Sequence, residues 1–291
     1  MLEGIITKGY SGFYYVQVQA ELWECSLRGR FRINAQDFLP GDRVKISPIK
    51  GTKGVIEEVL PRKNFLLRPT IANVDQTVIV LAARSPAPDL NLLDRIIIQV
   101  EAAQIEPLIL FNKADMVQPG EEQSILRIYQ QAGYRTLAVS AKSGQGIPEL
   151  KGMLSGRISV VAGPSGVGKS TLLNGVQQGL ELKTGEVSRK LRRGKHTTRH
   201  VELMPLECGG LVADTPGFSS LNLPQMLREE LAGYFPEINE LAHKCRFSSC
   251  MHWQEPQCAV KEGLEQGQIS SERYANYITF LAEVIDHERR Y

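Results

Sequence analysis

The chain has 291 residues, of which 42% are hydrophobic and 23% charged, a balance typical of a globular protein with two or three domains. No apolar run approaches the length that crosses a bilayer, and the first residues lack the basic-then-apolar pattern of a secretion signal, so we expect a cytoplasmic protein without a membrane partner. The net charge of +2 conceals two basic stretches. Residues 1–68 carry 11 Lys and Arg against 7 Asp and Glu, and residues 183–200 carry 7 against 1. Such stretches on an otherwise acidic chain favour contact with a polyanion over ordinary solvated faces.

Residues 1–68 predict a small all-β domain. Short apolar alternations, rich in β-branched and aromatic residues, are separated by turn signals such as Pro40-Gly41-Asp42 and Lys50-Gly51-Thr52. No helical period of comparable length interrupts them. The pattern favours about five strands closed into a barrel.

The hydrophobic pattern changes at residue 69, and residues 69–223 predict an α/β domain. Continuous apolar runs alternate with amphipathic stretches, which is typical of a parallel sheet covered on both faces. The expected strands are 77–83, 107–112, 136–141, 158–163 and 210–214, and the expected helices are Leu92–Gln104, Glu121–Ala132 and Lys169–Gln178.

Residues 224–291 predict a mainly helical domain built around a metal. Helical patterns cover Gln225–Tyr234 and Ser270–His287. Between them, three thiols and one imidazole fall within fourteen residues, enough for a closed tetrahedral structural zinc site: Cys245, Cys250, His252 and Cys258. The alternatives are a group of small buried residues without a metal, or His243 in place of one ligand.

A phosphate-binding loop follows the expected strand 158–163 and opens the next helix. It fits the pattern G-x-x-x-x-G-K-[ST], whose backbone N–H groups and helix N-terminus surround phosphate oxygens. Lys169 would reach the β- and γ-phosphates, and the Ser170 hydroxyl would bind Mg²⁺. This motif by itself suits ATP as well as GTP. The expected nucleotide-binding residues here are Gly163, Pro164, Ser165, Gly166, Val167, Gly168, Lys169, Ser170 and Thr171.

Two further motifs, each after an expected strand, select guanine. Asn112, Lys113 and Asp115 form N-K-x-D, in which a carboxylate accepts hydrogen bonds from the guanine ring N–H and its amine. Ser140, Ala141 and Lys142 form S-A-K, whose backbone meets the guanine oxygen. Because adenine offers no such pair of donors, both motifs together predict GTP.

A fourth motif, D-x-x-G, ends the expected strand 210–214. Asp214 is expected to bind Mg²⁺, and the Gly217 N–H to sense the γ-phosphate, which would make the following loop a switch. The guanine motifs precede the phosphate loop here, whereas the usual order is the reverse. The chain is therefore expected to be a circular permutant in which the switch leads directly into the C-terminal domain. We hypothesise that γ-phosphate-dependent movement passes directly into that domain.

The basic segment 188–200 is expected to contain catalytic groups. One of its threonines should complete the Mg²⁺ shell, with Thr198 preferred and Thr197 second. Many GTPases place Gln after D-x-x-G to orient water, but Phe218 stands here and cannot hydrogen-bond water. His196 is the candidate for that role, and a surface histidine in a basic loop is the equal alternative. The catalytic residues expected are thus Lys169, Thr198 and His196.

Taken together, these motifs resemble the bacterial family of small ribosomal subunit biogenesis GTPases, RsgA. The resemblance covers essentially the whole chain. It is carried by PRKNFLLRPTIANVDQ (61–76), NLLDR (91–95), NKAD, SAKSG, GPSGVGKST, RGKHTTRH (193–200), DTPGF and the C-x4-C-x-H-x5-C run. The hydrophobic residue after D-x-x-G is a feature of this family, so Phe218 is no departure.

The resemblance implies three domains: an OB-fold over 1–68 that binds RNA, a permuted GTPase domain over 69–223, and a zinc domain over 224–291. It also implies binding to the small ribosomal subunit and its 16S rRNA late in assembly, with hydrolysis of GTP to GDP stimulated by that subunit. A monomer is expected. The alternatives are an RNA-binding switch whose hydrolysis is incidental, acting on another ribosomal or tRNA target, and a permuted GTPase acting on the large subunit or on tRNA.

Overall fold

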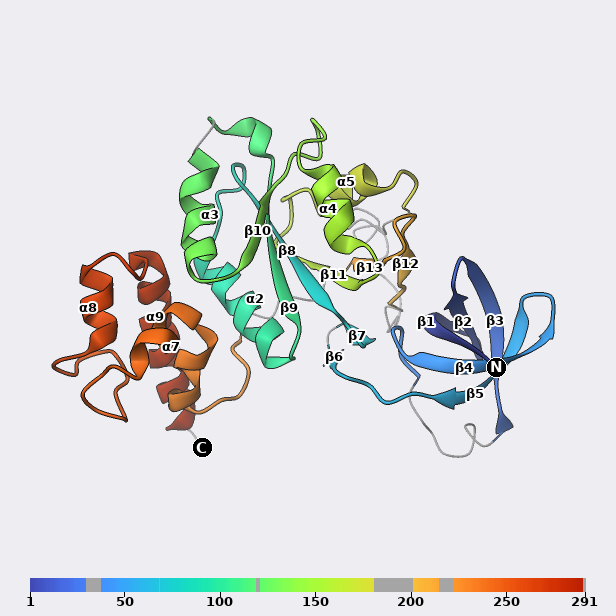
Figure 1. The fold of residues 1–291 in the computed structure, drawn as a ribbon, viewed down its shortest axis with the longest axis horizontal. Coiled ribbons are helices and arrows are strands. Elements are labelled where there is room, and N and C mark those ends of the chain that lie inside the picture. The colour runs from blue at the N-terminus through green and yellow to red at the C-terminus, as the bar shows by residue number, and fades with distance from the viewer. Residues whose placement is uncertain (30–37, 68, 119–120, 181–200, 215–221, 290–291) are drawn as a thin grey trace, which may run out of the picture. The chain divides into compact units, whose positions relative to one another are not determined.

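A computed structural model describes residues 1–29, 38–67, 69–118, 121–180, 201–214 and 222–289 (Figure 1). The chain divides into two compact units. One contains Met1–Val78, Ile147–Ala162 and Lys169–Phe218, and the other contains Ile79–Gly146, Gly163–Gly168 and Ser219–Tyr291. This division does not test the three domain boundaries expected from the sequence, which remain a prediction.

The expected N-terminal barrel is confirmed. Its strands are β1 (Leu2–Tyr10), β2 (Phe13–Val18), β3 (Glu21–Leu27), β4 (Arg43–Lys50) and β5 (Lys53–Val59). They close in the order β1-β2-β3-β5-β4, with β3 and β5 parallel and the other neighbours antiparallel. Alternate residues point inward and form a buried core that includes Ile6, Val16, Trp23, Ile46 and Ile56. Five strands closed in this order match the OB-fold expectation.

The central sheet is also confirmed, in the order β10-β9-β8-β11-β13-β12. Its strands are β8 (Gln76–Ala82), β9 (Glu106–Asn112), β10 (Arg135–Ala138), β11 (Ile158–Ala162), β12 (Met204–Pro205) and β13 (Leu211–Asp214). Strand β9 pairs in parallel with β10, and β11 with β13, whereas the short β12 is antiparallel to β13. All residues of β8 and β11 are buried, which explains why both strands are largely apolar, with Gln76, Thr77 and Ser159 as buried polar exceptions.

The helices of the α/β part lie close to their expected positions. They are α2 (Leu90–Ala102), α3 (Glu121–Gln131), α4 (Ile147–Leu154) and α5 (Lys169–Val176). Helix α2 begins two residues before its expected start because the Asp89 carboxylate accepts from the Leu92 N–H at 2.9 Å and caps it. Helix α4 was not among the expected helices, since a proline and a glycine interrupt its eight residues. A small hairpin, β6 (Phe65–Leu67) and β7 (Thr70–Ala72), precedes the sheet.

The C-terminal region is helical, as expected. It comprises the 3-10 helix η2 (Arg228–Tyr234), α7 (Pro236–Ala242), α8 (Ala259–Glu265) and α9 (Ser271–Glu288). The expected helix at 225–234 is thus a 3-10 helix that starts at Arg228. Buried residues of these helices pack around Phe235, Tyr277 and Phe280, with Ile98 of α2 in the same cluster. Among the described helices, none is long and apolar enough to cross a membrane.

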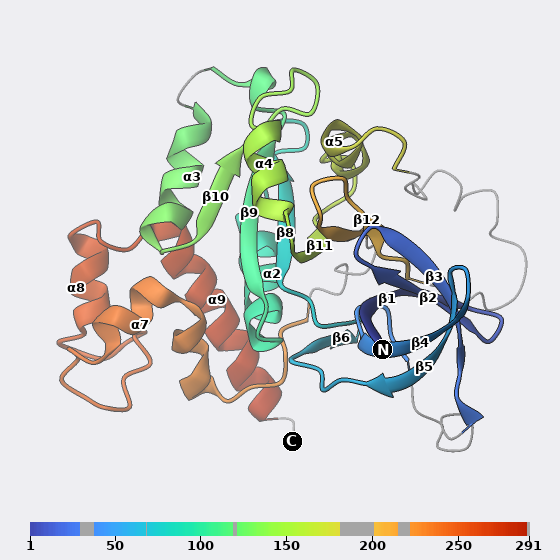
Figure 2. The same ribbon diagram turned by 45° about the vertical axis from the view of Figure 1, so that its right-hand side comes forward.

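A buried polar network joins α2 to α7 and α9, and Figure 2 shows α9 running beside α2. The Arg273 guanidinium is 2.6 Å from Asp94 and 2.7 Å from Glu237, and the residue is 1% exposed. Asp94 also accepts from Tyr129 on α3 at 3.0 Å and from Asn276 at 2.6 Å. Every formal charge in this network therefore has a partner, which buried charges require.

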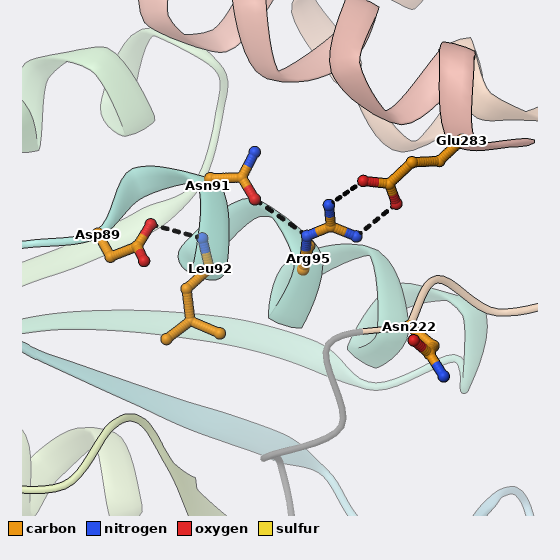
Figure 3. Close-up of a pocket in the computed structure, with 6 residues that line it drawn as sticks. All are labelled: Asp89, Asn91, Leu92, Arg95, Asn222 and Glu283. Carbon is orange, nitrogen blue, oxygen red and sulfur yellow. Dashed lines mark hydrogen bonds and ion pairs between the residues drawn. The ribbon is translucent and has the colours of Figure 1, made fainter.

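A second ion pair between the same helices is more exposed. Figure 3 shows Arg95 on α2 facing Glu283 on α9, which accepts from the guanidinium through both carboxylate oxygens, while Asn91 accepts from its Nε at 2.9 Å. These residues line a pocket of about 440 Å³ together with Asp89, Leu92 and Asn222. The NLLDR stretch noted in the sequence therefore supplies contacts between α2 and α9.

Candidate functional site

The loops that carry the guanine motifs and the phosphate loop meet at one buried side chain. Asn112, the last residue of β9, is 2% exposed. Its amide nitrogen donates to the Val167 carbonyl in the phosphate loop at 2.9 Å, and its amide oxygen accepts from the Ala141 N–H at 3.2 Å. One asparagine thus joins its own loop to two others, whose contacting residues lie 29 and 55 positions further along the sequence.

Lys113 makes a second connection between the same loops. It stands at φ +63° in the left-handed region, which turns the chain sharply into the 3-10 helix η1 (Ala114–Met116). Its ammonium donates to the Gly166 carbonyl at 2.8 Å and to the Ser85 carbonyl. Ser85 was missed by the sequence reasoning. The available signal was its position just beyond the carboxyl end of β8, where α/β sheets place ligand-binding loops.

The Asp115 carboxylate is exposed and oriented by Ser140. The Ser140 hydroxyl, fully buried, donates to one oxygen of Asp115 at 2.6 Å and accepts from the Ser143 N–H at 3.1 Å. Residues 140–145 are closed by a hydrogen bond from the Ser140 N–H to the Gln145 carbonyl at 2.9 Å. A carboxylate held in this way loses little side-chain entropy when it accepts a ligand's hydrogen bonds. Lys142, the third S-A-K residue, is exposed.

The phosphate loop has the backbone that its glycines permit. Gly168 lies at φ +92°, and a Cβ there would come within 2.6 Å of the Asn112 amide nitrogen. Gly163 lies at φ +134°, and a Cβ there would come within 2.1 Å of the Val80 carbonyl oxygen. Any side chain at these two positions would therefore displace the loop. Helix α5 then begins at Lys169, so that Ser170 and Thr171 stand in its first turn, as phosphate binding requires.

The D-x-x-G motif begins at Asp214, the last residue of β13. Asp214 pairs with Val161 of β11, two positions before Gly163 starts the phosphate loop. The remaining expected residues of this motif and of the basic segment lie outside the described residues: His196, Thr197, Thr198, Gly217 and Phe218.

The four expected zinc ligands lie together in the C-terminal region. Their ligand atoms are all within 4.8 Å of one another. The Cys245 and Cys258 sulfurs are 3.9 Å apart, and His252 Nδ1 is 3.5 Å from the first and 3.6 Å from the second. Tetrahedral zinc with Zn–S near ~2.3 Å and Zn–N near ~2.0 Å requires S···S of about 3.8 Å and S···N of about 3.5 Å. The spacing therefore fits zinc, and His243 is not part of the group.

The protonation chemistry of this cluster also fits a dication. Burial raises the pKa of the Cys250 thiol to about 12 and raises that of Cys258, so bare thiolates are unfavourable there. Burial lowers the pKa of His252 and favours the neutral imidazole that binds metals. A bound divalent cation supplies the charge that lets these thiols ionise.

The loop around the cluster is held by outer contacts. The Tyr274 hydroxyl donates to the His252 carbonyl at 2.7 Å, and the Tyr277 hydroxyl donates to the Met251 carbonyl at 3.0 Å. The Glu255 carboxylate accepts from the Met251 and Trp253 N–H groups at 2.7 and 2.9 Å. Burial raises the pKa of Glu255, but these backbone donors outweigh it and hold the pKa below its ordinary value. Such contacts keep metal ligands in place.

Comparison with known proteins connects these features. Residues 59–224 match the family model of the RsgA GTPase, and residues 3–56 match that of the RsgA N-terminal domain. Small ribosomal subunit biogenesis GTPases RsgA from Moorella thermoacetica and Carboxydothermus hydrogenoformans are 53% and 48% identical to the chain, over 100% and 99% of both sequences respectively. Among solved structures, YjeQ from Thermotoga maritima has a TM-score of 0.82 at 37% identity and 98% coverage of both chains. YloQ, described as a circularly permuted GTPase, has a TM-score of 0.82 at 38% identity, covering 99% of this chain and 96% of that one.

Proposed function

The chain belongs to the RsgA family of circularly permuted GTPases, and from this premise we propose that it binds the small ribosomal subunit, assists its late maturation and hydrolyses GTP with stimulation by that subunit. The names of its relatives and the two basic stretches support this partner, since 16S rRNA is a polyanion. The observation that carries the nucleotide part is Asn112, which ties the guanine motifs to the phosphate loop.

Guanine recognition is assigned to the loops after β9 and β10. The Asp115 carboxylate accepts from the guanine ring N–H and exocyclic amine, while Ser140 holds it in position. The Ala141 and Lys142 backbone meets the guanine oxygen. Adenine would leave the carboxylate without donors, at a cost of about 1–3 kcal/mol or more for a charged group.

Phosphate binding is assigned to residues 163–171. Their backbone N–H groups and the Lys169 ammonium hold the phosphate oxygens and stabilise the charge that develops as the terminal phosphate departs. Ser170, Asp214 and Thr198 would hold Mg²⁺, which neutralises part of the phosphate charge when bound. The Gly217 N–H would sense the γ-phosphate.

Water activation is assigned to the basic segment, because Phe218 has no hydrogen-bonding group. The His196 imidazole, two positions before Thr198, orients the attacking water in this proposal. In this proposal the 16S rRNA, a polyanion, stimulates the reaction by contacting this basic segment.

The function is tested by GTP turnover with and without small ribosomal subunits. We expect a low intrinsic rate and an increase of at least about tenfold with saturating small subunits, because a correctly positioned acid–base group contributes about 10²–10⁴-fold in rate. Purified large subunits and bulk tRNA serve as controls and should produce no comparable increase. Equal turnover in all four conditions would contradict the proposed partner.

The Cys245, Cys250, His252 and Cys258 cluster is proposed as a structural site for one zinc ion. Metal analysis should return one equivalent, and chelation should lower the free energy of unfolding by about 4 kcal/mol if free zinc exceeds its Kd by about a thousandfold. His252→Ala should lose the metal, whereas the matched variant His243→Ala should keep it. Zinc retained by the first variant and lost by the second would reassign the ligand.

A further inference from the structure

Strand β1 of the barrel contains a β-bulge at Thr7. Ile6 pairs with Val16 and Lys8 with Tyr15, so the register shifts by one residue and Thr7 is left as a β-bulge. Thr7 is 2% exposed, and its hydroxyl donates to the Tyr15 carbonyl at 3.1 Å. A bulge interrupts the strand ladder and redirects backbone groups toward other partners.

The redirected backbone group binds the segment that follows the basic stretch. The Thr7 carbonyl accepts from the Leu203 N–H at 2.9 Å, and the neighbouring Lys8 ammonium is 2.6 Å from the Glu202 carboxylate. Leu203 is 1% exposed. A backbone hydrogen bond and an ion pair thus hold two consecutive residues on β1, within one compact unit.

These two residues stand between two proposed Mg²⁺ ligands. Glu202 follows Thr198 by four positions in the sequence. Immediately after Leu203, β12 pairs with β13, with Met204 opposite Val212, and β13 ends at Asp214. The barrel is therefore bonded to the chain directly before the strand pair that ends at Asp214.

The barrel is also fixed where its own chain leaves it. Arg62 pairs with the buried Asp42 at 2.6 Å, and the Asn73 amide donates to the Gly41 carbonyl at 2.9 Å. The barrel is thus attached both at this exit and at residues 202–203. It cannot turn freely about its linker, and any displacement of the barrel would also shift residues 202–203.

We propose that the contact of Thr7 and Lys8 with Leu203 and Glu202 couples the barrel to the paired strands β12 and β13, so that RNA bound to the barrel accelerates GTP hydrolysis through the strand that ends at Asp214. The inference rests on the proposed function. It adds a route from the barrel to β13 and assigns it to Lys8 and Glu202, which touch neither nucleotide nor metal in that proposal.

The test separates the stimulated rate from the basal rate. Lys8→Met and Glu202→Gln should each reduce the stimulation of kcat by small subunits about two- to fivefold, because an ion pair as exposed as this one contributes up to about 1 kcal/mol. The basal kcat, the Kd for GTP and the affinity for the subunit should remain unchanged. The exchanged pair Lys8→Glu with Glu202→Lys should recover most of the stimulation.

Lys45 and Glu58 provide a matched control inside the barrel. They form an ion pair at 2.8 Å with side chains 39% and 49% exposed, close to the 34% and 46% of Lys8 and Glu202. Lys45→Met should leave stimulation intact. Wild-type stimulation in Lys8→Met and Glu202→Gln, failure of the exchanged pair to recover, or an equal loss in Lys45→Met would each overturn the inference while leaving the proposed function standing. A wild-type chain that small subunits do not stimulate would overturn the proposed function, and the inference with it.

Discussion

Replacing Arg273 with methionine should lower the free energy of unfolding by about 3–5 kcal/mol, the cost of removing one partner from a buried ion pair. Asp94 and Glu237 would remain buried without the guanidinium, 0% and 9% exposed respectively. The guanidinium also lies 4.4 Å from the centre of the Phe235 ring, so its cation–π contact would be lost as well. Urea denaturation followed by circular dichroism measures the change.

Two further variants make this prediction specific. Arg228→Met removes an arginine from the more exposed pair with Glu288, where the side chains are 39% and 18% exposed, and should cost about 0–1 kcal/mol. Adding Asp94→Asn to Arg273→Met should recover part of the lost stability, because one uncompensated charge disappears. A loss no larger for Arg273→Met than for Arg228→Met would show that the network contributes little.

The same substitution should affect Glu101, a neighbouring carboxyl on α2. Burial raises the pKa of Glu101 to about 7, while a hydrogen bond with Tyr134 and the charge of Arg273 oppose that rise. Because the folded pKa lies above the ordinary value of 4.5, this group weakens the fold as the pH rises from about 4.5 to 7. Removing Arg273 raises the pKa further, so the stability loss should be larger at pH 8 than at pH 5.

Replacing Asp115 with asparagine should change the preferred base from guanine to xanthine. Guanine presents two donors to this position, whereas xanthine has a carbonyl in place of the amine and can accept from the new amide N–H. The new amide oxygen can still accept from the ring N–H, but its NH2 group faces the guanine amine, so one hydrogen bond to a carboxylate, worth about 1.5–3 kcal/mol, is lost and GTP binding should weaken by about 10- to 200-fold. Binding of fluorescent GTP and XTP analogues measures both affinities.

Asp89→Asn is the matched control for this change of charge. Asp89 caps α2, a role that asparagine fills equally well, so neither stability nor base preference should move. If Asp115→Asn kept its affinity for GTP, or lost affinity for both nucleotides equally, Asp115 would not be the group that reads the base.

The buried network also bears on the hypothesis that γ-phosphate-dependent movement passes from the switch into the C-terminal region. Asn222, just after the segment 215–221, has its carbonyl bound by the Gln99 amide of α2 at 2.7 Å, and α9 is bonded to α2 through Arg273 and Arg95. Hydrogen bonds and ion pairs therefore hold the C-terminal helices against α2. Movement of the switch would have to displace these contacts to move the C-terminal helices.

The sequence by itself determined the features whose chemistry is local. Strand alternation predicted the five-stranded barrel, the loop at 163–170 predicted phosphate binding, and four ligands within fourteen residues predicted the metal cluster. Each depends on a few neighbouring positions, because the alternation of a strand and the spacing of metal ligands are both set within one segment.

Tertiary structure alone decided how those segments are joined. Nothing near Asn112 in the sequence indicates that its amide spans two other loops, and the contact of Asp94 with Arg273 crosses 179 positions. The bulge at Thr7 and its bond to Leu203 are equally invisible to local periodicity. Long-range pairs of this kind depend on which faces pack together and which buried polar groups then need a partner, and that is settled only when the whole chain folds.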